Sequence, residues 1–130
     1  MDRLNRWAPL ALAALRIVAG LLFIEHGTMK LFNFPPSDHS VGFQMSVMGL
    51  AGMLETFGGL LILLGLFTRP VAFILSGQMA VAYWMAHFPQ SPYPAVNMGD
   101  AAVLFCFVFL YLVFAGPGAL SLDGVMRRKT

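Results

Sequence analysis

Charged residues are scarce in this chain of 130 residues. Only 11% of the residues are charged and 58% are hydrophobic, whereas soluble domains carry about 25% charged residues. The formal net charge is +2, and the positive residues do not gather along one face as they do in nucleic-acid-binding proteins, so we expect no nucleic-acid partner. The scarcity of charge indicates that a lipid bilayer, rather than water, surrounds most of the chain.

Cysteine is also scarce, and the motifs of soluble enzymes are missing. Cys106 is the single cysteine, so the chain cannot form a disulfide or a dithiol pair by itself. There is no Gly-rich phosphate loop, dinucleotide fingerprint or nucleophile elbow. No two histidines are four residues apart and no Glu-x-x-His motif occurs, so no metal site is predicted. The sequence assigns no catalytic residue.

What the chain does contain is four apolar segments, at about residues 7–34, 46–67, 71–88 and 98–115. A membrane helix needs roughly 17 to 25 residues, and each segment reaches that length. A soluble bundle would show polar stripes, yet residues 60–67 and 101–115 are apolar all round. A cleaved signal peptide is also disfavoured, because Arg16 interrupts the first segment. The sequence predicts an all-α fold, a bundle of four transmembrane helices in a single domain, residues 1–130.

Positive residues outside these segments lie on one side of the predicted membrane. They are Arg3, Arg6, Arg69, Arg127, Arg128 and Lys129. The loops at about residues 35–45 and 89–97 contain no Lys or Arg, so the positive-inside rule places both termini in the cytoplasm. After the fourth segment, residues 119–126 are expected to form a short interfacial turn or helix.

Ionisable residues inside the apolar segments are the most informative, because each costs about 2.5 to 3.5 kcal/mol near the bilayer centre on insertion scales. One helical stripe of the first segment consists of Arg16, Gly20, Phe23, Gly27 and Lys30. The comparable stripe of the second segment consists of Glu55, Gly59, Ile62, Leu66 and Arg69. Glycines allow close approach of helices, so we expect the two stripes to face each other.

Most of the ionisable and amide residues in the four predicted helices lie at a similar depth. They are expected to form one cluster in the outer half of the membrane. Its members are Glu25, His26, Lys30, Glu55, Gln78, His87 and Asp100, with Arg16 apart from them. The cluster is either a ligand-binding site or a structural ion-pair network. Lys30 either pairs with Glu55 or extends its ammonium group to the membrane surface. His87 fits an interfacial side chain, and Asp100 fits a group that complements the helix dipole.

Three blocks of the sequence resemble the DoxX family. The run from Arg16 to Phe32 is similar to the family's first-helix signature, with the arginine, glycine, phenylalanine, His-Gly and Lys-Leu-Phe positions in register. Residues 55–69, with Gly58-Gly59 and the ending Gly-Leu-Phe-Thr-Arg, resemble its second helix and turn, and residues 116–123 resemble its C-terminal ending. The resemblance implies a four-helix bacterial inner-membrane protein. The family is similar to the small membrane subunit of a thiosulfate:quinone oxidoreductase, and some of its members are linked to membrane-associated oxidoreductase complexes. The resemblance therefore implies a role in a membrane redox system.

Two functional hypotheses of different classes follow. The first is a membrane subunit of a redox system. Such a subunit either binds a quinone at its polar cluster or anchors a membrane or peripheral oxidoreductase partner. The second is a non-catalytic assembly or chaperone-like membrane protein, whose charges only hold its own bundle together. A carrier function is weaker, because no inverted repeat with broken helices is evident, although a homo-oligomer could build a pathway.

Overall fold

The computed structural model describes residues 2–128, a range that is helical and contains no strand, so the all-α prediction is confirmed. Lys129, one of the predicted cytoplasmic positive residues, lies outside this range. The α-helices are α1 (Asp2–Asn5), α2 (Ala8–Phe32), α3 (Val47–Met53), α4 (Gly59–Leu64), α5 (Thr68–Ala82), α6 (Pro94–Asn97), α7 (Asp100–Ala115) and α8 (Leu122–Arg128). Two π-helical turns, η1 (Leu54–Gly58) and η2 (Tyr83–His87), continue α3 and α5.

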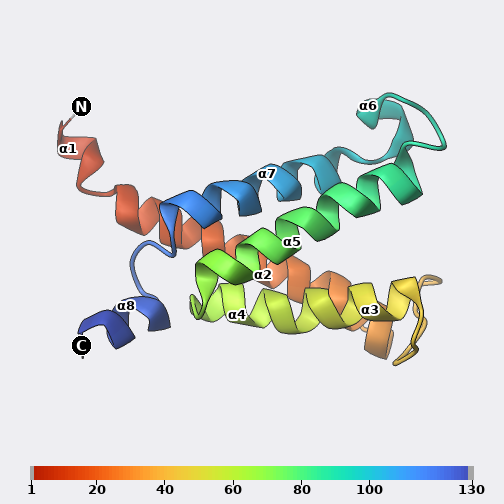
Figure 1. Cartoon of the computed structure of the whole chain (residues 1–130), viewed down its shortest axis with the longest axis horizontal. Helices are drawn as coiled ribbons and strands as arrows, with labels where there is room; N and C mark the ends of the chain where they lie inside the picture. The colour runs from red at the N-terminus through yellow and green to blue at the C-terminus, as the bar shows by residue number, and fades with distance from the viewer. Residues whose placement is uncertain (1, 129–130) are drawn as a thin grey trace.

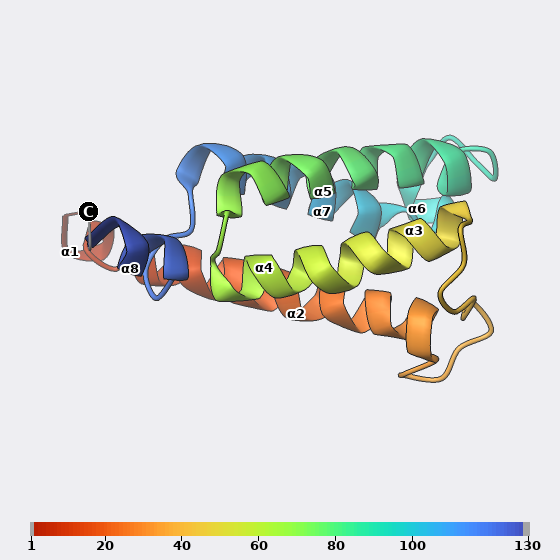
Figure 2. The same ribbon diagram turned by 60° about the horizontal axis from the view of Figure 1, so that its bottom comes forward.

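The long helices form two antiparallel pairs. One pair consists of α2 with α3, η1 and α4, and the other of α5 with α7 (Figures 1 and 2). The pairs stack on each other as a four-helix bundle. The N-terminal α1 and the C-terminal α8 lie at the same end of the bundle, while α3 and α6 lie at the opposite end (Figure 1).

Each long helical stretch coincides with one apolar segment of the sequence. By length and composition, residues Ala8–Phe32 (25 residues) and Val47–Leu64 (18 residues) are long and apolar enough to cross a membrane. Helix α7 is a shorter apolar helix. Helix α5 begins at Thr68, earlier than the predicted start of the segment at about residue 71. Pro70 fits the first turn of this helix, because the N–H groups of a first turn have no partner within the helix and proline lacks that group.

Local sequence explains where the first helices end and begin. Asn33 adopts the left-handed conformation that ends α2. The Ser46 hydroxyl accepts a hydrogen bond from the Gly49 amide at 3.1 Å and caps α3. Gly65 ends α4 with a φ of 67°, which a residue without a Cβ adopts at low cost.

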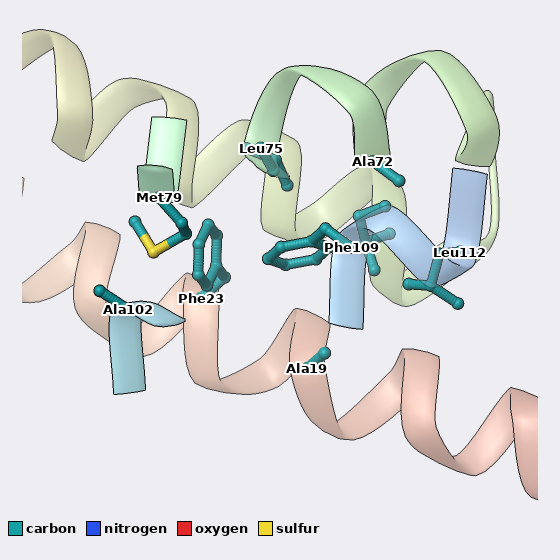
Figure 3. Packing of buried hydrophobic residues seen from close by; sticks show 9 residues of the cluster. Ala19, Phe23, Ala72, Leu75, Met79, Ala102, Phe109 and Leu112 are labelled. Atoms are coloured by element: carbon teal, nitrogen blue, oxygen red, sulfur yellow. The ribbon is translucent and has the colours of Figure 1, made fainter. Parts of the chain in front are cut away.

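Aromatic and aliphatic side chains from all four long stretches meet in the bundle centre (Figure 3). The Phe23 ring on α2 packs edge-on against Phe105 and Phe109 of α7, with centroid distances of 5.0 and 4.7 Å. Leu75 and Met79 of α5 complete this contact region. The core therefore joins the two helix pairs.

The outward faces of the same helices are also apolar. Large exposed side chains include Val18, Leu21, Phe57, Leu60, Phe73, Ile74, Phe107 and Phe114. A soluble monomer rarely exposes contiguous apolar surface on this scale. The distribution fits a protein whose outer surface contacts lipid.

Candidate functional site

Lys30 and Glu55 form a buried ion pair between α2 and η1. The Lys30 ammonium nitrogen lies 2.7 Å from Glu55 Oε1 and 2.6 Å from Oε2, so it donates to both oxygens. The side chains are only 14% and 4% exposed. Of the two interpretations of Lys30, the structure therefore forms the ion pair, and the ammonium group does not extend to the surface.

Close packing of helix backbones brings the pair together. A Cβ atom at Gly27 would lie 2.2 Å from Thr56 Oγ1, and one at Gly20 would lie 2.9 Å from the Gly59 carbonyl oxygen. Only a residue without a side chain fits at such distances. The π-helical turn η1 begins just before Glu55, and a π turn rotates the residues that follow it relative to a regular α-helix. Such single turns occur often at functional sites.

His26 lies exposed beside the pair on α2. Its Nδ1 is 2.8 Å from the Leu22 carbonyl oxygen. A carbonyl only accepts hydrogen bonds, so Nδ1 donates, and in a neutral ring this makes Nε2 the acceptor. The ring also meets Phe105 at a centroid distance of 6.4 Å. Because His26 is exposed, its Nε2 can accept a hydrogen bond from another molecule.

Gln78 on α5 approaches the same level from the other helix pair. A Cβ atom at Gly58 would lie 2.9 Å from Leu75 Cδ2, which fixes the contact between α5 and η1. Gln78 follows Leu75 by three residues, and Glu55 precedes Gly58 by three residues. Because the two helices are antiparallel, Gln78 and Glu55 lie at the same level. The Gln78 side-chain oxygen is buried and has no hydrogen-bond partner among the described residues.

The remaining predicted members are Glu25, Asp100 and His87. Glu25 and Asp100 are exposed, and no described hydrogen bond links either to the Lys30–Glu55 pair. His87 Nδ1 bonds to the Asn97 carbonyl oxygen at 3.0 Å, and its ring stacks on Tyr83. The structure therefore brings together Lys30 and Glu55, places His26 on the same helix as Lys30 and Gln78 at the level of Glu55, and bonds His87 to the loop before α7.

Asn97 organises that loop, and the sequence patterns did not single it out as a site residue. It is 1% exposed, and its side-chain amide donates to the Ser91 carbonyl at 2.8 Å and to the Tyr83 hydroxyl at 3.2 Å. Its side-chain oxygen accepts from the Gly99 amide at 2.8 Å. The available signal was an asparagine in a Pro-rich connection, a setting typical of side-chain-bonded turns.

Arg16 belongs to a second polar region at the opposite end of the bundle. It is fully buried, and its guanidinium donates to the carbonyl oxygens of Pro117, Ala119 (3.1 Å) and Leu120 (2.9 Å). Arg69 likewise donates to the last carbonyls of α7, at Val113 and Phe114. Both arginines therefore hold the C-terminal part of the chain against the bundle.

Asp123 fastens the same C-terminal segment to α5. Its carboxylate accepts from the Phe67 amide at 2.8 Å and the Thr68 amide at 2.9 Å. Burial alone would raise the pKa of Asp123, but these hydrogen bonds and the charge of Arg127 outweigh it, so the pKa lies below its usual value.

Among residues 2–128 no three His, Cys, Asp or Glu side chains gather in a metal-binding group.

The geometry defines a helical bundle with apolar outer faces, a buried ion pair near one end and a C-terminal segment held in place at the other. The chain belongs to the DoxX family, whose model matches residues 11–88. It is an inner-membrane protein of bacterial type.

Relatives with curated names support this assignment. The chain is 43% identical to an uncharacterized protein of Haemophilus influenzae, over 99% of this chain and 100% of that protein. It is 32% identical to inner membrane protein YphA of Escherichia coli K12 (88% of this chain, 89% of that protein). It is 29% identical to inner membrane protein YqjF of the same strain (88% and 90%). No solved structure matches the chain.

Proposed function

We propose that the chain crosses the inner membrane four times with both termini in the cytoplasm. The four apolar helical stretches, their exposed apolar faces and the position of α1 and α8 at one end of the bundle support this topology. The positive residues Arg3, Arg6 and Arg69 favour the cytoplasm for that end. In this topology the Lys30–Glu55 pair lies in the outer half of the membrane.

We further propose that the protein is a membrane subunit of a redox system and binds a quinone head group beside this pair. The observation that carries the proposal is the buried side-chain oxygen of Gln78 at the level of Glu55, which has no hydrogen-bond partner within residues 2–128. An unpaired buried acceptor costs about 1 to 3 kcal/mol, a cost that a hydroxyl donor would remove. The hydroxyl group of a quinol, the reduced form of a quinone, is such a donor and is soluble in the membrane.

The neighbouring groups suit both redox states of the head group. An ammonium group has three N–H donors, and Glu55 takes two of those on Lys30, so one is left for a quinone carbonyl. His26 Nε2 can take up a proton released when the quinol is oxidised. Electrons would pass to or from an oxidoreductase partner, and the membrane subunit would bind the quinone and handle its protons.

Titration of the purified protein with a short-chain ubiquinone or menaquinone analogue tests the proposal. We expect saturable binding that Gln78→Leu weakens about tenfold, because it removes a hydrogen bond to the ligand. Glu25→Gln is the matched control, since Glu25 is exposed and has no described bond to the pair. Absence of saturable binding, or equal affinities for Gln78→Leu and Glu25→Gln, would reject the quinone site.

One observation favours the second function, an assembly or chaperone-like role without a ligand. The Lys30–Glu55 pair is closed, with both carboxylate oxygens bonded to one ammonium group. Under this alternative, His26→Ala and Gln78→Leu leave function intact as long as the protein folds. Complementation of a deletion strain with the two variants separates the alternatives, because the quinone proposal expects a loss of function in both.

A further inference from the structure

A groove of about 580 Å³ lies at the end of the bundle that carries α8, between α2, α4 and the C-terminal segment. This volume falls within the roughly 300 to 1,000 Å³ that ligand pockets span. Its apolar walls include Ile17, Leu63, Leu64 and Val125. Its polar groups are Arg16, Ser121 and Arg128. The groove is separate from the Lys30–Glu55 pair, which lies toward the other end of α2.

Arg16 gives the floor of the groove a positive charge. It is fully buried, and its three hydrogen-bond acceptors are neutral carbonyl groups. Among residues 2–128 its Nε has no hydrogen-bond partner and no carboxylate forms a direct ion pair with it, although the charge of Asp123 acts on it from a longer distance. A buried charge without a direct ion pair is costly, and its field acts strongly across a short distance in a low-dielectric medium. An anion above the floor would be attracted to it.

The other polar groups reinforce this preference. Arg128 is exposed at the mouth of the groove, where it can contact a bound anion directly. The Ser121 oxygen accepts from the Gly124 amide at 3.0 Å, which leaves its hydroxyl hydrogen to donate. None of the described lining residues is acidic. The nearby Asp123 directs its carboxylate away from the groove, to the amides at the start of α5.

The apolar walls continue into the outer surface of the bundle. Leu64, Leu122 and Val125 are each about two-fifths exposed, at 42%, 40% and 41%. A free inorganic anion would leave these walls unused. A molecule with a phosphate group and a hydrocarbon chain would use both the positive floor and the walls.

We propose that this groove binds the head group of an anionic phospholipid from the cytoplasmic leaflet. The phosphate lies above Arg16 and within reach of Arg128, and one acyl chain runs along Leu63 and Leu64. The inference rests on the proposed topology, which puts the groove at the cytoplasmic interface, where anionic lipids attract basic groups. It does not depend on quinone binding.

Native mass spectrometry of the purified protein, with added phosphatidylglycerol or phosphatidylcholine, tests the proposal. We expect one phosphatidylglycerol per chain to be retained in preference to phosphatidylcholine. Arg128→Gln should weaken its binding about fivefold, the effect of one cation near an anionic surface. Leu64→Trp should also weaken it without changing the charge, because the indole fills the apolar wall. Arg16 stays unchanged in the test, since it holds the C-terminal segment in place.

Arg3→Gln is the matched control, because Arg3 is exposed on α1 at the same end of the bundle and does not line the groove. It removes the same charge and should leave retention within about twofold of the wild type, less than the effect of a cation in contact with the anion. Equal retention of the two lipids, or equal weakening by Arg3→Gln and Arg128→Gln, would overturn the proposal. Displacement of the lipid by millimolar inorganic phosphate would also overturn it, because the site would then be one for free anions. Loss of quinone binding with lipid retention intact would reject only the proposed function.

Discussion

Glu55 accepts two hydrogen bonds from the ammonium group of Lys30, although 25 residues separate the two in the sequence. Breaking a buried pair by removing one partner leaves the other charge uncompensated. Lys30→Met should therefore lower the free energy of unfolding by about 3 kcal/mol. Thermal unfolding in detergent measures the loss.

Two further variants make that result specific. The exchange of both residues, Lys30→Glu with Glu55→Lys, should recover most of the lost stability. Glu25→Gln on the same helix should change stability by less than about 0.5 kcal/mol, because Glu25 is exposed. If Lys30→Met unfolds at the same temperature as Glu25→Gln, the pair does not stabilise the bundle.

Close contact between α2 and η1 leads to a second prediction. A Cβ atom at Gly27 would lie 2.2 Å from Thr56 Oγ1 and 2.4 Å from the Thr56 nitrogen, so Gly27→Ala must push the two elements apart. We expect a loss of about 1 to 3 kcal/mol, typical of overpacking. Gly77→Ala is the control, because nothing lies within 4 Å of a Cβ there. It should be neutral or stabilise α5, and similar losses in both variants would contradict the close contact.

Asp123 should make the attachment of the C-terminal segment depend on pH. Its folded-state pKa is lowered, so the stabilisation is present above the usual Asp pKa and disappears as the pH falls through the lower folded value. The segment should become more sensitive to protease as the pH falls below about 4, the usual Asp pKa. An acid-active protease applied to the detergent-solubilised protein measures this release.

Asp123→Asn provides the comparison. The amide removes the carboxylate charge but keeps an oxygen that can accept from Phe67 and Thr68, so the cost at neutral pH should be near 1 kcal/mol or less. The variant should show a smaller change with acid than the wild type. An unchanged acid response in Asp123→Asn would assign that response to other groups.

Sequence patterns anticipated some of these features because they depend on helical periodicity. The facing stripes of glycine and charge predicted Lys30 near Glu55, and the structure places the two side chains in contact. The apolar segments coincide with the long helical stretches for the same reason. Both inferences need only the residue spacing along a regular helix.

Other features depend on contacts between distant parts of the chain. The π-helical turns at Leu54–Gly58 and Tyr83–His87 shift the helix register, and a periodic pattern does not contain that shift. His87 bonds to Asn97 through the geometry of a loop. Arg16 finds its acceptors among carbonyls of the C-terminal segment, more than 100 residues away. Backbone acceptors are present in every residue, so no residue type signals them.

The central claim, a quinone site beside Lys30 and Glu55, is tested most directly by the quinone bound to the protein itself. The protein is reconstituted in lipid nanodiscs with a native bacterial quinone, re-isolated, and analysed by mass spectrometry for quinone per chain. We predict near-stoichiometric quinone in the wild type and in Glu25→Gln, and about tenfold less in Gln78→Leu. Quinone content no higher than in nanodiscs without the protein, or equal content in Glu25→Gln and Gln78→Leu, would contradict the claim.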